Sequence, residues 1–370
     1  MRVGLVTTSY PRWRGDAAGS FVAGHAAYLR GTGAIVDVIA AGAPDVDPAW
    51  DAAERVVRVA APPGLFYAGG APEALAAGRG GAARFSARLA AAVIARARRW
   101  DATVAHWLAP SGLAALPTRG PLLVIAHGGD VHLLAQRGLL APSLRALAWR
   151  GARIACVSSR LRDAVIAAAP GATVLVQPMG VDDAATAAIV AARQRRPAQR
   201  VRVVAVLARL VPIKGVDRAV RALARLPADV RLVVAGDGPE RARIVAVAQA
   251  AGVVDRVELR GWLDAAARDR LLVEADAVAV PSVADADGRH EGTPLAALEA
   301  LAAGVPTVVT ATGGVSALAA HGACVVPPDD PVALAAALAA AIALPGAPAA
   351  GLGWAAVGRR LDEHWGRRSA

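Results

Sequence analysis

The chain of 370 residues contains no asparagine and only two cysteines. The absence of asparagine excludes N-linked glycosylation, because every acceptor sequon begins with that residue. Cys156 and Cys324 stand far apart in apolar, strand-like runs, which argues against a disulfide framework. Such cysteine use is typical of a reducing compartment, so we expect a cytoplasmic protein.

Long hydrophobic runs are also missing from the sequence. No apolar stretch reaches the roughly 18 residues that a helix needs to cross a bilayer. The best candidate, residues 331–345, is short and rich in alanine, and it predicts a packed helix. The first residues, MRVGLVTTSYP, follow a β-strand pattern and not the basic-then-apolar pattern of a signal peptide. With 55% hydrophobic and 19% charged residues, the composition is that of a globular protein with room for two domains.

Aromatic residues and lysine are scarce as well. Aromatic residues make up 4% of the chain and no nucleic-acid-binding motif is present, so we expect no nucleic-acid partner. Lys214 is the single lysine among 41 Lys and Arg residues. Because all other basic side chains are arginine, a single lysine is not expected to serve as an ordinary surface cation. A phosphate site favours such a compact ammonium group, and the alternative is an ordinary surface ion pair.

The positive charge is unevenly distributed along the chain. Residues 1–180 carry 19 arginines against 10 acidic residues, whereas residues 181–370 carry 22 basic against 20 acidic residues. An arginine-rich composition alone would raise both halves alike. The difference therefore predicts that the first half meets an anionic partner, either a lipid-linked acceptor at the inner leaflet or an acidic polysaccharide.

One segment of the first half fits an anionic membrane surface. Residues 83–100 predict a helix with Phe85, Leu89 and Val93 along one side and arginines around it. A helix of this kind can lie on a membrane, with each nearby cation contributing about 1 kcal/mol. The alternative, which we favour for this helix, is that its apolar side packs into its own domain.

Short apolar strands alternate with helical segments in two series. The pattern restarts after a charged, proline-containing stretch at residues 191–200. Strands separated by helices of this length indicate parallel sheets built from βαβ units. We therefore expect an α/β protein with two doubly wound Rossmann-like domains, at residues 1–180 and 197–350. A last helix at residues 354–370 is expected to pack back on the first domain.

The stretch HEGTPLAALEALAAGVP, residues 290–306, places two glutamates around a helix start. Thr293 as N-cap and Pro294 at the first helical position predict a helix over residues 294–303. Glu291 precedes this helix and Glu299 lies a little over one turn inside it. An anion on the helix tip would have one carboxylate beside each end, and carboxylates accept hydrogen bonds from hydroxyl groups. A phosphate flanked by two polyols fits, and the alternative is a solvated surface glutamate.

Two further strand-to-helix loops carry residues suited to a phosphate ligand. Arg209 stands at the end of a strand in LARLVPIKG, five residues before Lys214. Gly236 and Gly238 in VVAGDGPE let the backbone approach a ligand closely. Taken alone, the second loop is weak evidence, because a tight turn needs nothing more.

Together these motifs resemble the retaining glycosyltransferases of family 4, which have the two-Rossmann-domain GT-B fold with the domains facing across a cleft. The matching pieces of the second half occur in the order of the family: ARL (208–210), KG (214–215), GDGP (236–239), PS (281–282) and EGTPLAALEA (291–300). The first half is similar more loosely, in YPRWRGDAAGSFV, AHGGD and QPMGVD. Ala208 stands where the family usually has glycine, and Met179 where it has asparagine.

The resemblance implies a role for each matching residue. Arg209 and Lys214 would hold the donor diphosphate, and Glu299 would bind the ribose hydroxyls of the nucleotide. Glu291 would bind the transferred sugar, and His127 would lie near the reacting sugar. The catalytic set implied by the resemblance is therefore His127, Glu291, Arg209 and Lys214.

A wider set is implied for substrate binding. Gly15 would close on the phosphate from the facing domain. His106 either lines the acceptor cleft or packs at a strand end, and we weigh these alternatives equally. The other predicted substrate-binding residues are Glu299, Gly238, Trp262, Leu263, Thr293, Pro294, Leu295 and Asp130.

The resemblance implies transfer of a sugar from a nucleotide-diphosphate sugar to a glycan or lipid-linked acceptor, in cell-envelope or exopolysaccharide synthesis. We expect no cofactor and no essential metal, because the Asp-Ala-Asp at residues 285–287 lacks identifiable partner ligands. We expect a cytoplasmic enzyme that is peripheral on the inner face of the plasma membrane. The alternatives are an epimerase-like enzyme of the same fold acting on sugar nucleotides, and a non-catalytic glycan-binding relative.

Overall fold

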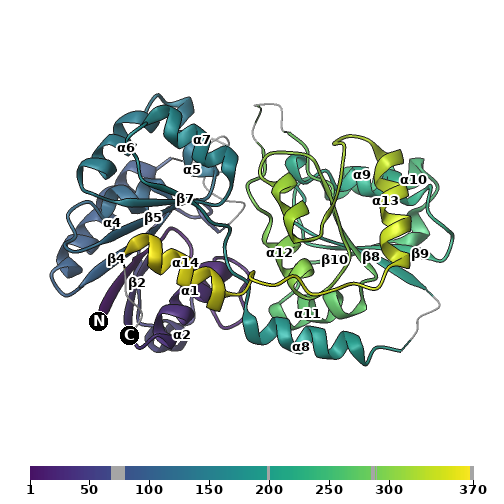
Figure 1. Cartoon of the computed structure of the whole chain (residues 1–370), viewed down its shortest axis with the longest axis horizontal. Helices are drawn as coiled ribbons and strands as arrows, with labels where there is room; N and C mark the ends of the chain where they lie inside the picture. Colours follow the sequence, from purple (N-terminus) through teal and green to yellow (C-terminus); the bar gives the residue numbers. More distant parts are fainter. Residues whose placement is uncertain (68–79, 198–200, 285–287, 289, 367–370) are drawn as a thin grey trace. The chain divides into compact units, whose positions relative to one another are not determined.

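The computed structural model describes residues 1–67, 80–197, 201–284, 288 and 290–366 (Figure 1). It divides into two compact units, Met1–Gly180 with Trp354–Ala370, and Val181–Gly353. Each unit contains one sheet whose strand pairs are all parallel among the described residues. The strand orders are β3-β2-β1-β4-β5-β6-β7 and β10-β9-β8-β11-β12-β13. In both sheets the order reverses beside the first strand, as in a doubly wound fold. The predicted fold class is confirmed.

The first unit alternates strands with helices along the chain. Its strands are β1 (Arg2–Val6), β2 (Ile35–Ala41), β3 (Val56–Val59), β4 (Ala102–His106), β5 (Leu122–Ala126), β6 (Arg153–Cys156) and β7 (Val174–Val176). Its described α-helices are α1 (Ser20–Gly31), α2 (Pro48–Ala53), α4 (Ala82–Ala97), α5 (Gly129–Gln136), α6 (Leu140–Trp149), α7 (Ser159–Ala168) and α14 (Trp354–Trp365). Every residue of β4 and β5 is buried, as expected for central strands covered on both faces.

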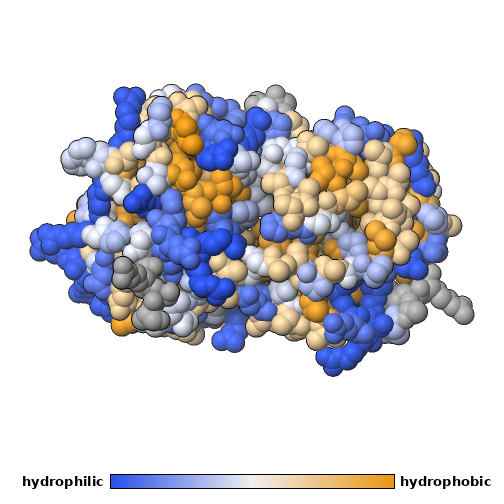
Figure 2. Space-filling view, in the orientation of Figure 1, coloured by the Kyte–Doolittle hydropathy of each residue, from blue (hydrophilic) through white to orange (hydrophobic). Residues whose placement is uncertain are grey.

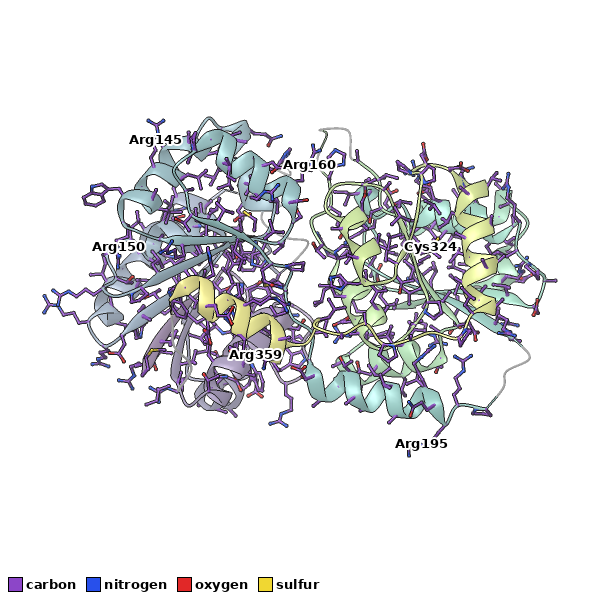
Figure 3. The ribbon with its side chains drawn as sticks, viewed as in Figure 1. Arg145, Arg150, Arg160, Arg195, Cys324 and Arg359 are labelled. Carbon is purple, nitrogen blue, oxygen red and sulfur yellow. The ribbon has the colours of Figure 1, made fainter. Side chains whose placement is uncertain are left out.

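Helix α4 packs into the first unit through its apolar side. Phe85, Leu89 and Val93 are buried in the core on one face of the sheet. The alternative favoured for this helix is therefore the observed one, and its arginines stand around a packed stripe. The positive charge of the unit remains at its surface, where Figure 3 shows Arg145 of α6 pointing away from the sheet.

Helix α14 completes the opposite face of the first unit, although it follows the second unit in the chain. Trp354, Val357 and Leu361 are buried in one cluster with residues of α1. The α1 surface is shaped for this contact, since a Cβ on Gly24 would lie 2.1 Å from the Trp354 indole nitrogen. The Tyr28 hydroxyl of α1 also donates to Asp362 of α14, at 2.8 Å.

The second unit follows the same plan. Its strands are β8 (Arg202–Leu207), β9 (Val230–Ala235), β10 (Val257–Gly261), β11 (Ala277–Val280), β12 (Thr307–Thr310) and β13 (Cys324–Val326). Its described α-helices are α8 (Asp183–Gln194), α9 (Val216–Leu223), α10 (Arg241–Ala250), α11 (Ala265–Glu274), α12 (Leu295–Ala302) and α13 (Pro331–Ala343). Figure 2 shows apolar and polar residues interspersed on the face of this unit that it presents.

The start of α12 differs from the sequence prediction by one residue. The N-cap is Pro294, not Thr293, and no side chain caps the helix. The backbone of Pro294 is extended, with ψ of 124°, so the helix begins at Leu295. A proline fixes φ but leaves ψ free, which is why it can stand just outside a helix as well as at its first position.

The packing of α14 predicts a large effect of one substitution. Trp354→Ala should lower the free energy of unfolding by about 3–5 kcal/mol, because it leaves a cavity between α14 and α1. The matched control is Trp149→Ala, since Trp149 is 90% exposed. That control should change stability by less than about 0.5 kcal/mol. Chemical denaturation of the two variants measures the difference, and equal losses would contradict the structural role of α14.

Candidate functional site

The second unit brings Lys214 and Glu291 into an ion pair, although 77 positions separate them. Lys214 ends a short 3-10 helix, Pro212–Lys214, that follows β8. The other carboxylate oxygen of Glu291 accepts a hydrogen bond from the Ser282 hydroxyl. The two charged side chains are 20% and 11% exposed, so they form a partly buried pair. The cluster unites three separate motifs of the sequence.

Backbone contacts hold this cluster at the carboxyl ends of neighbouring strands. The Val283 N–H donates to the Ile213 carbonyl at 2.9 Å, which joins the loop after β11 to the loop after β8. The Thr310 hydroxyl, at the end of β12, donates to the Ser282 carbonyl. The Gly314 N–H donates to the Glu291 carbonyl at 3.1 Å. Strands β8, β11 and β12 are adjacent in the sheet, and β8 and β11 flank the point where the strand order reverses, where doubly wound sheets bind ligands.

The GDGP loop after β9 packs directly on the loop that carries Arg209. Gly238 has φ of 155°, and a Cβ there would lie 2.4 Å from the Leu210 carbonyl oxygen. The Leu210 N–H donates to the Asp237 carbonyl at 2.9 Å. Glycine is therefore required here by backbone-to-backbone contact. Ala208 is not among the non-glycine residues with positive φ, so alanine in place of the family's glycine introduces no backbone strain.

Glu299 makes a second ion pair, with Arg268 of α11, at 3.2 Å. Its side chain is 14% exposed. Burial raises the pKa of Glu299, and the Arg268 guanidinium opposes that rise. Asp269 and Asp182 act in the same direction as burial. Of the residues predicted for the base pocket after β10, Trp262 is 62% exposed, whereas Leu263 packs against the core.

In the first unit, the predicted His106 and His127 lie at the carboxyl ends of adjacent strands β4 and β5. The Nδ1 atom of His106 lies 3.0 Å from Nε2 of His127. His106 has no exposed surface, so packing at a strand end describes it better than lining a cleft. Burial lowers the pKa of His127 to about 3 and lowers that of His106 as well. Both imidazoles are therefore neutral at physiological pH.

Asp130 and Gly15 shape loops of the first unit. The Asp130 carboxylate is 5% exposed and accepts hydrogen bonds from the Leu108 and Gly128 backbone N–H groups, at 2.6 and 2.9 Å. It also accepts from the His127 N–H at 3.2 Å, which fixes the turn that presents the imidazole. Gly15 follows β1 with φ of 90° and open space at its Cβ position.

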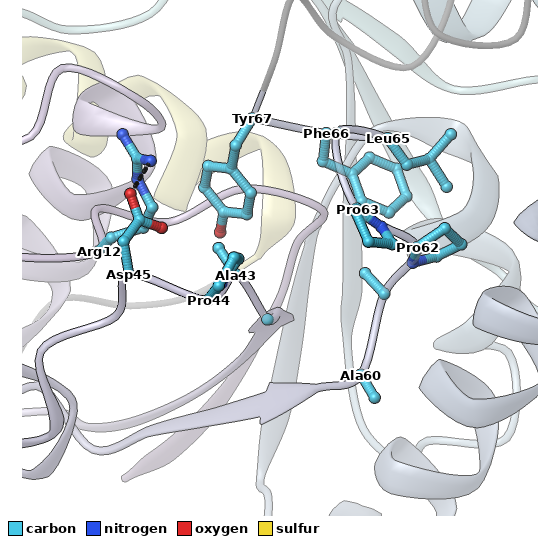
Figure 4. Close-up of a pocket in the computed structure, with 13 residues that line it drawn as sticks. Arg12, Ala43, Pro44, Asp45, Ala60, Pro62, Pro63, Leu65, Phe66 and Tyr67 are labelled. Atoms are coloured by element: carbon cyan, nitrogen blue, oxygen red, sulfur yellow. Dashed lines mark hydrogen bonds and ion pairs between the residues drawn. The ribbon is translucent and has the colours of Figure 1, made fainter. Parts of the chain in front are cut away.

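A pocket of about 660 Å³ opens in the first unit where β1, β2 and β3 end (Figure 4). Its walls are mainly apolar. Arg12 pairs with Asp45 at 2.5 Å and with Asp16 at 2.7 Å, and its guanidinium lies 4.2 Å from the Trp13 ring. The Tyr67 hydroxyl bonds to backbone carbonyls. The wall-forming residues include Pro44, Pro62, Pro63, Leu65, Phe66 and Tyr67.

Several of these residues escaped sequence reasoning. Thr310 ends a buried strand and could have been suspected, since polar residues at strand ends line such sites. Ser282 belongs to the PS motif at residues 281–282, but no role was predicted for it. Arg268 is one helical arginine among many, and the pocket residues carry no recognisable motif. No group of three His, Cys, Asp or Glu side chains is arranged to hold a metal ion in the described part of the chain. The Asp-Ala-Asp at 285–287 lies outside it. Within the same part, no helix is long and apolar enough to cross a membrane.

Comparison with known proteins bears on the second unit most directly. Residues 191–350 match the model of the family described as glycosyl transferases group 1. The match confirms the predicted resemblance of these residues to glycosyltransferases at the level of group 1. WcaL of Escherichia coli, named for colanic acid biosynthesis, is 30% identical over 257 residues, which are 65% of this chain and 61% of WcaL. A Mycobacterium tuberculosis GDP-mannose-dependent phosphatidylinositol dimannoside mannosyltransferase is 42% identical over 122 residues, or 31% of this chain and 29% of that protein.

Two solved structures share the fold over almost the whole chain. Sucrose-phosphate synthase from Thermosynechococcus elongatus has a TM-score of 0.72 at 20% identity, covering 98% of both chains. Anabaena HepE in complex with UDP and glucose has a TM-score of 0.68 at 21% identity, covering 93% of this chain and 90% of HepE. At such identities the likeness shows the two-domain Rossmann-like architecture of GT-B glycosyltransferases.

The burial of Glu299 predicts how stability depends on pH. Its pKa in the folded protein lies above its ordinary value, so the folded state holds this proton more tightly than the unfolded state. The protonated Glu299 side chain therefore contributes to the free energy of unfolding at low pH. This contribution is lost as the pH rises through the pKa of Glu299 in the folded protein. Between the ordinary glutamate pKa and neutral pH, the wild type should therefore lose stability relative to Glu299→Gln. Denaturation midpoints across pH measure this, and parallel curves for the two proteins would contradict it.

Proposed function

We propose that this protein is a retaining glycosyltransferase that moves a sugar from a nucleoside-diphosphate sugar to a glycan or lipid-linked acceptor. The observation that carries the proposal is the Lys214–Glu291–Ser282 cluster at the ends of β8, β11 and β12. It joins a cation suited to a phosphate with a carboxylate suited to a sugar hydroxyl. The family match over residues 191–350 supports the same activity, and the name of WcaL supports a role in polysaccharide synthesis. HepE, of the same fold, was crystallised with UDP-glucose, which supports a nucleotide-sugar donor.

The proposed chemistry asks the site to stabilise charge on the leaving group. As the bond between the anomeric carbon and the diphosphate breaks, negative charge grows on the diphosphate. Lys214 and Arg209 would stabilise that charge. In a typical site, losing one such donor raises the activation free energy by about 3–4 kcal/mol. The acceptor hydroxyl then bonds to the anomeric carbon on the same face, and its proton passes to the departing phosphate. We expect no metal to be needed for these steps.

Glu291 has a double role in this proposal. It holds the Lys214 ammonium in place, so that a partly buried cation is never left without a partner. When the Lys214 ammonium group also interacts with the diphosphate, the Glu291 carboxylate can accept a hydrogen bond from a sugar hydroxyl. Glu299 would accept hydrogen bonds from the ribose hydroxyls. Burial raises its pKa, and the Arg268 guanidinium opposes that rise and favours the ionised carboxylate.

We expect Lys214→Ala to lower kcat/KM by about two decades or more, because a charge-stabilising donor is lost. Lys214→Arg should restore only part of the activity, since the planar guanidinium does not occupy the place of a compact ammonium group. Steady-state assays with a panel of nucleotide sugars measure both variants. Full activity of Lys214→Ala would remove the diphosphate role.

The two glutamates serve as a matched pair of controls. Thermal shifts with nucleoside diphosphates should fall in Glu299→Gln. Glu291→Gln should keep those shifts, because its amide oxygen can still accept a hydrogen bond from Lys214, and should lose transfer. Equal loss of diphosphate affinity would contradict the ribose and sugar assignments. No shift of the wild type with any nucleotide would overturn the transferase proposal. A product formed without an acceptor would favour the epimerase alternative. Binding of the donor or of a glycan without turnover would favour the non-catalytic alternative.

We further propose that the pocket of the first unit receives an apolar portion of a lipid-linked acceptor. Its volume is in the range of small-molecule sites, and its polar groups are largely engaged in internal bonds. A free sugar would find few hydrogen-bond partners there, whereas a hydrocarbon would contact proline and aromatic walls. The excess of 19 arginines over 10 acidic residues in positions 1–180 supports an anionic acceptor, or an anionic membrane surface that presents it.

Filling this pocket should impair acceptor use without affecting the donor. Ala43→Phe, on the pocket wall, should raise the KM for a lipid-linked acceptor by roughly tenfold, about the effect of losing one apolar group's burial. Ala27→Phe on the exposed side of α1 is the matched control. Transfer should also rise with the anionic lipid content of acceptor vesicles and fall with salt. Unchanged acceptor KM in Ala43→Phe would reject the pocket, and insensitivity to anionic lipid would reject the membrane surface.

A further inference from the structure

Three histidines form a continuous chain of imidazole rings through the first unit. His25 lies on α1, His106 ends β4, and His127 follows β5. Nδ1 of His25 lies 3.1 Å from Nε2 of His106, and Nδ1 of His106 lies 3.0 Å from Nε2 of His127. His25 and His106 are 1% and 0% exposed, whereas His127 is partly exposed. The chain therefore runs from the core to the carboxyl edge of the sheet.

Aromatic rings hold this chain in place. The indole of Trp354 stacks on His25, with ring centres 4.9 Å apart and an angle of 12°. The ring centres of Phe21 and Trp107 lie 5.1 and 4.8 Å from the centre of the His127 ring. This surrounding is apolar, so a positive charge on any of the three rings would be costly.

The charged groups on the neighbouring elements are engaged elsewhere. The carboxylate of Asp130, on α5, accepts hydrogen bonds from backbone N–H groups, including that of His127. Asp362 of α14 accepts a hydrogen bond from the Tyr28 hydroxyl. Cys156, at the end of β6, has its thiol pKa raised by burial to about 12 and stays neutral. The three imidazoles are thus one another's titratable neighbours.

The chemistry of neutral imidazole restricts the chain to two proton arrangements. Each neutral ring has one N–H donor and one lone-pair acceptor. Within a chain of two Nδ1···Nε2 contacts, all three protons must therefore stand on Nδ1 or all three on Nε2. Any mixed arrangement puts two N–H groups or two lone pairs face to face. The tautomer of the buried rings consequently decides the tautomer of His127.

We propose that His106 and His25 are positioning residues that fix the tautomer and ring orientation of His127. Nδ1 of His127 is the ring nitrogen that the chain does not use, and it therefore meets a substrate group in one defined role, as donor or as acceptor. What that nitrogen meets rests on the proposed transferase function. The coupling of the three tautomers does not, and it can be measured on the protein alone.

Nitrogen-15 NMR of the histidine rings tests the coupling directly. In the wild type, His25, His106 and His127 should share one tautomer and remain neutral from mildly acidic to mildly basic pH. His106→Phe keeps a ring in place but removes both hydrogen bonds. In that variant, His127 should show mixed tautomers, whereas its pKa should stay low because the ring remains buried. His132→Phe, on α5 and outside the histidine chain, is the matched control and should leave the His127 signals unchanged.

Kinetics separate positioning from a merely structural role. His106→Phe should lower kcat by roughly 10- to 100-fold, the usual cost of losing an orienting partner, with little change in nucleoside-diphosphate affinity. His106→Gln, whose amide can both donate and accept, should restore part of the rate. Mixed tautomers in the wild type, or an unchanged His127 ring in His106→Phe, would overturn the proposal. If the protein proves not to be a transferase, the NMR result still decides whether the rings are coupled.

Discussion

The ion pair between Lys214 and Glu291 is the contact on which the geometry of the second unit's candidate site depends. The two side chains are only 20% and 11% exposed. Separating them costs free energy, because each charge would be left desolvated without a partner. The pair therefore fastens the loop after β8 to the segment before α12, and Ser282 adds the loop after β11 through the same carboxylate. One carboxylate therefore holds the loop after β8 and both ends of the connection between β11 and α12 at one place.

The candidate site of the second unit and the histidine chain of the first unit bury polar groups in different ways. In the second unit's site, acidic and basic side chains are paired, Lys214 with Glu291 and Arg268 with Glu299. In the first unit, the buried polar chain is built from three imidazoles, and burial lowers the pKa of His106 and His127 so that these two rings carry no charge. Charged pairs suit a site that is to bind an anion, whereas neutral rings give directional hydrogen bonds without repelling or attracting charge over a distance.

Much of the fold was predictable from the sequence, because alternating apolar strands and helices leave few arrangements other than two parallel sheets. The pairing of Lys214 with Glu291 could be anticipated only through the family resemblance, since no local pattern relates residues so far apart. His25 shows the limit more clearly. As a single histidine on an apolar helix it resembles an ordinary core residue, and its role depends on two strands and a terminal helix meeting it. The start of α12 was missed by one residue because ψ of Pro294 is set by tertiary contacts and not by the proline ring.

Helix α14 also bears on how the protein can fold as it is synthesised. A ribosome makes residues 354–365 after the whole of the second unit, yet these residues cover the face of α1 that carries Gly24 and Tyr28. Until they emerge, the nascent first unit leaves apolar surface on α1 uncovered, which is where an unfinished domain is prone to aggregate. The second unit uses a continuous stretch, Val181–Gly353, and can close in the meantime. Vectorial synthesis should therefore complete the later unit before the earlier one.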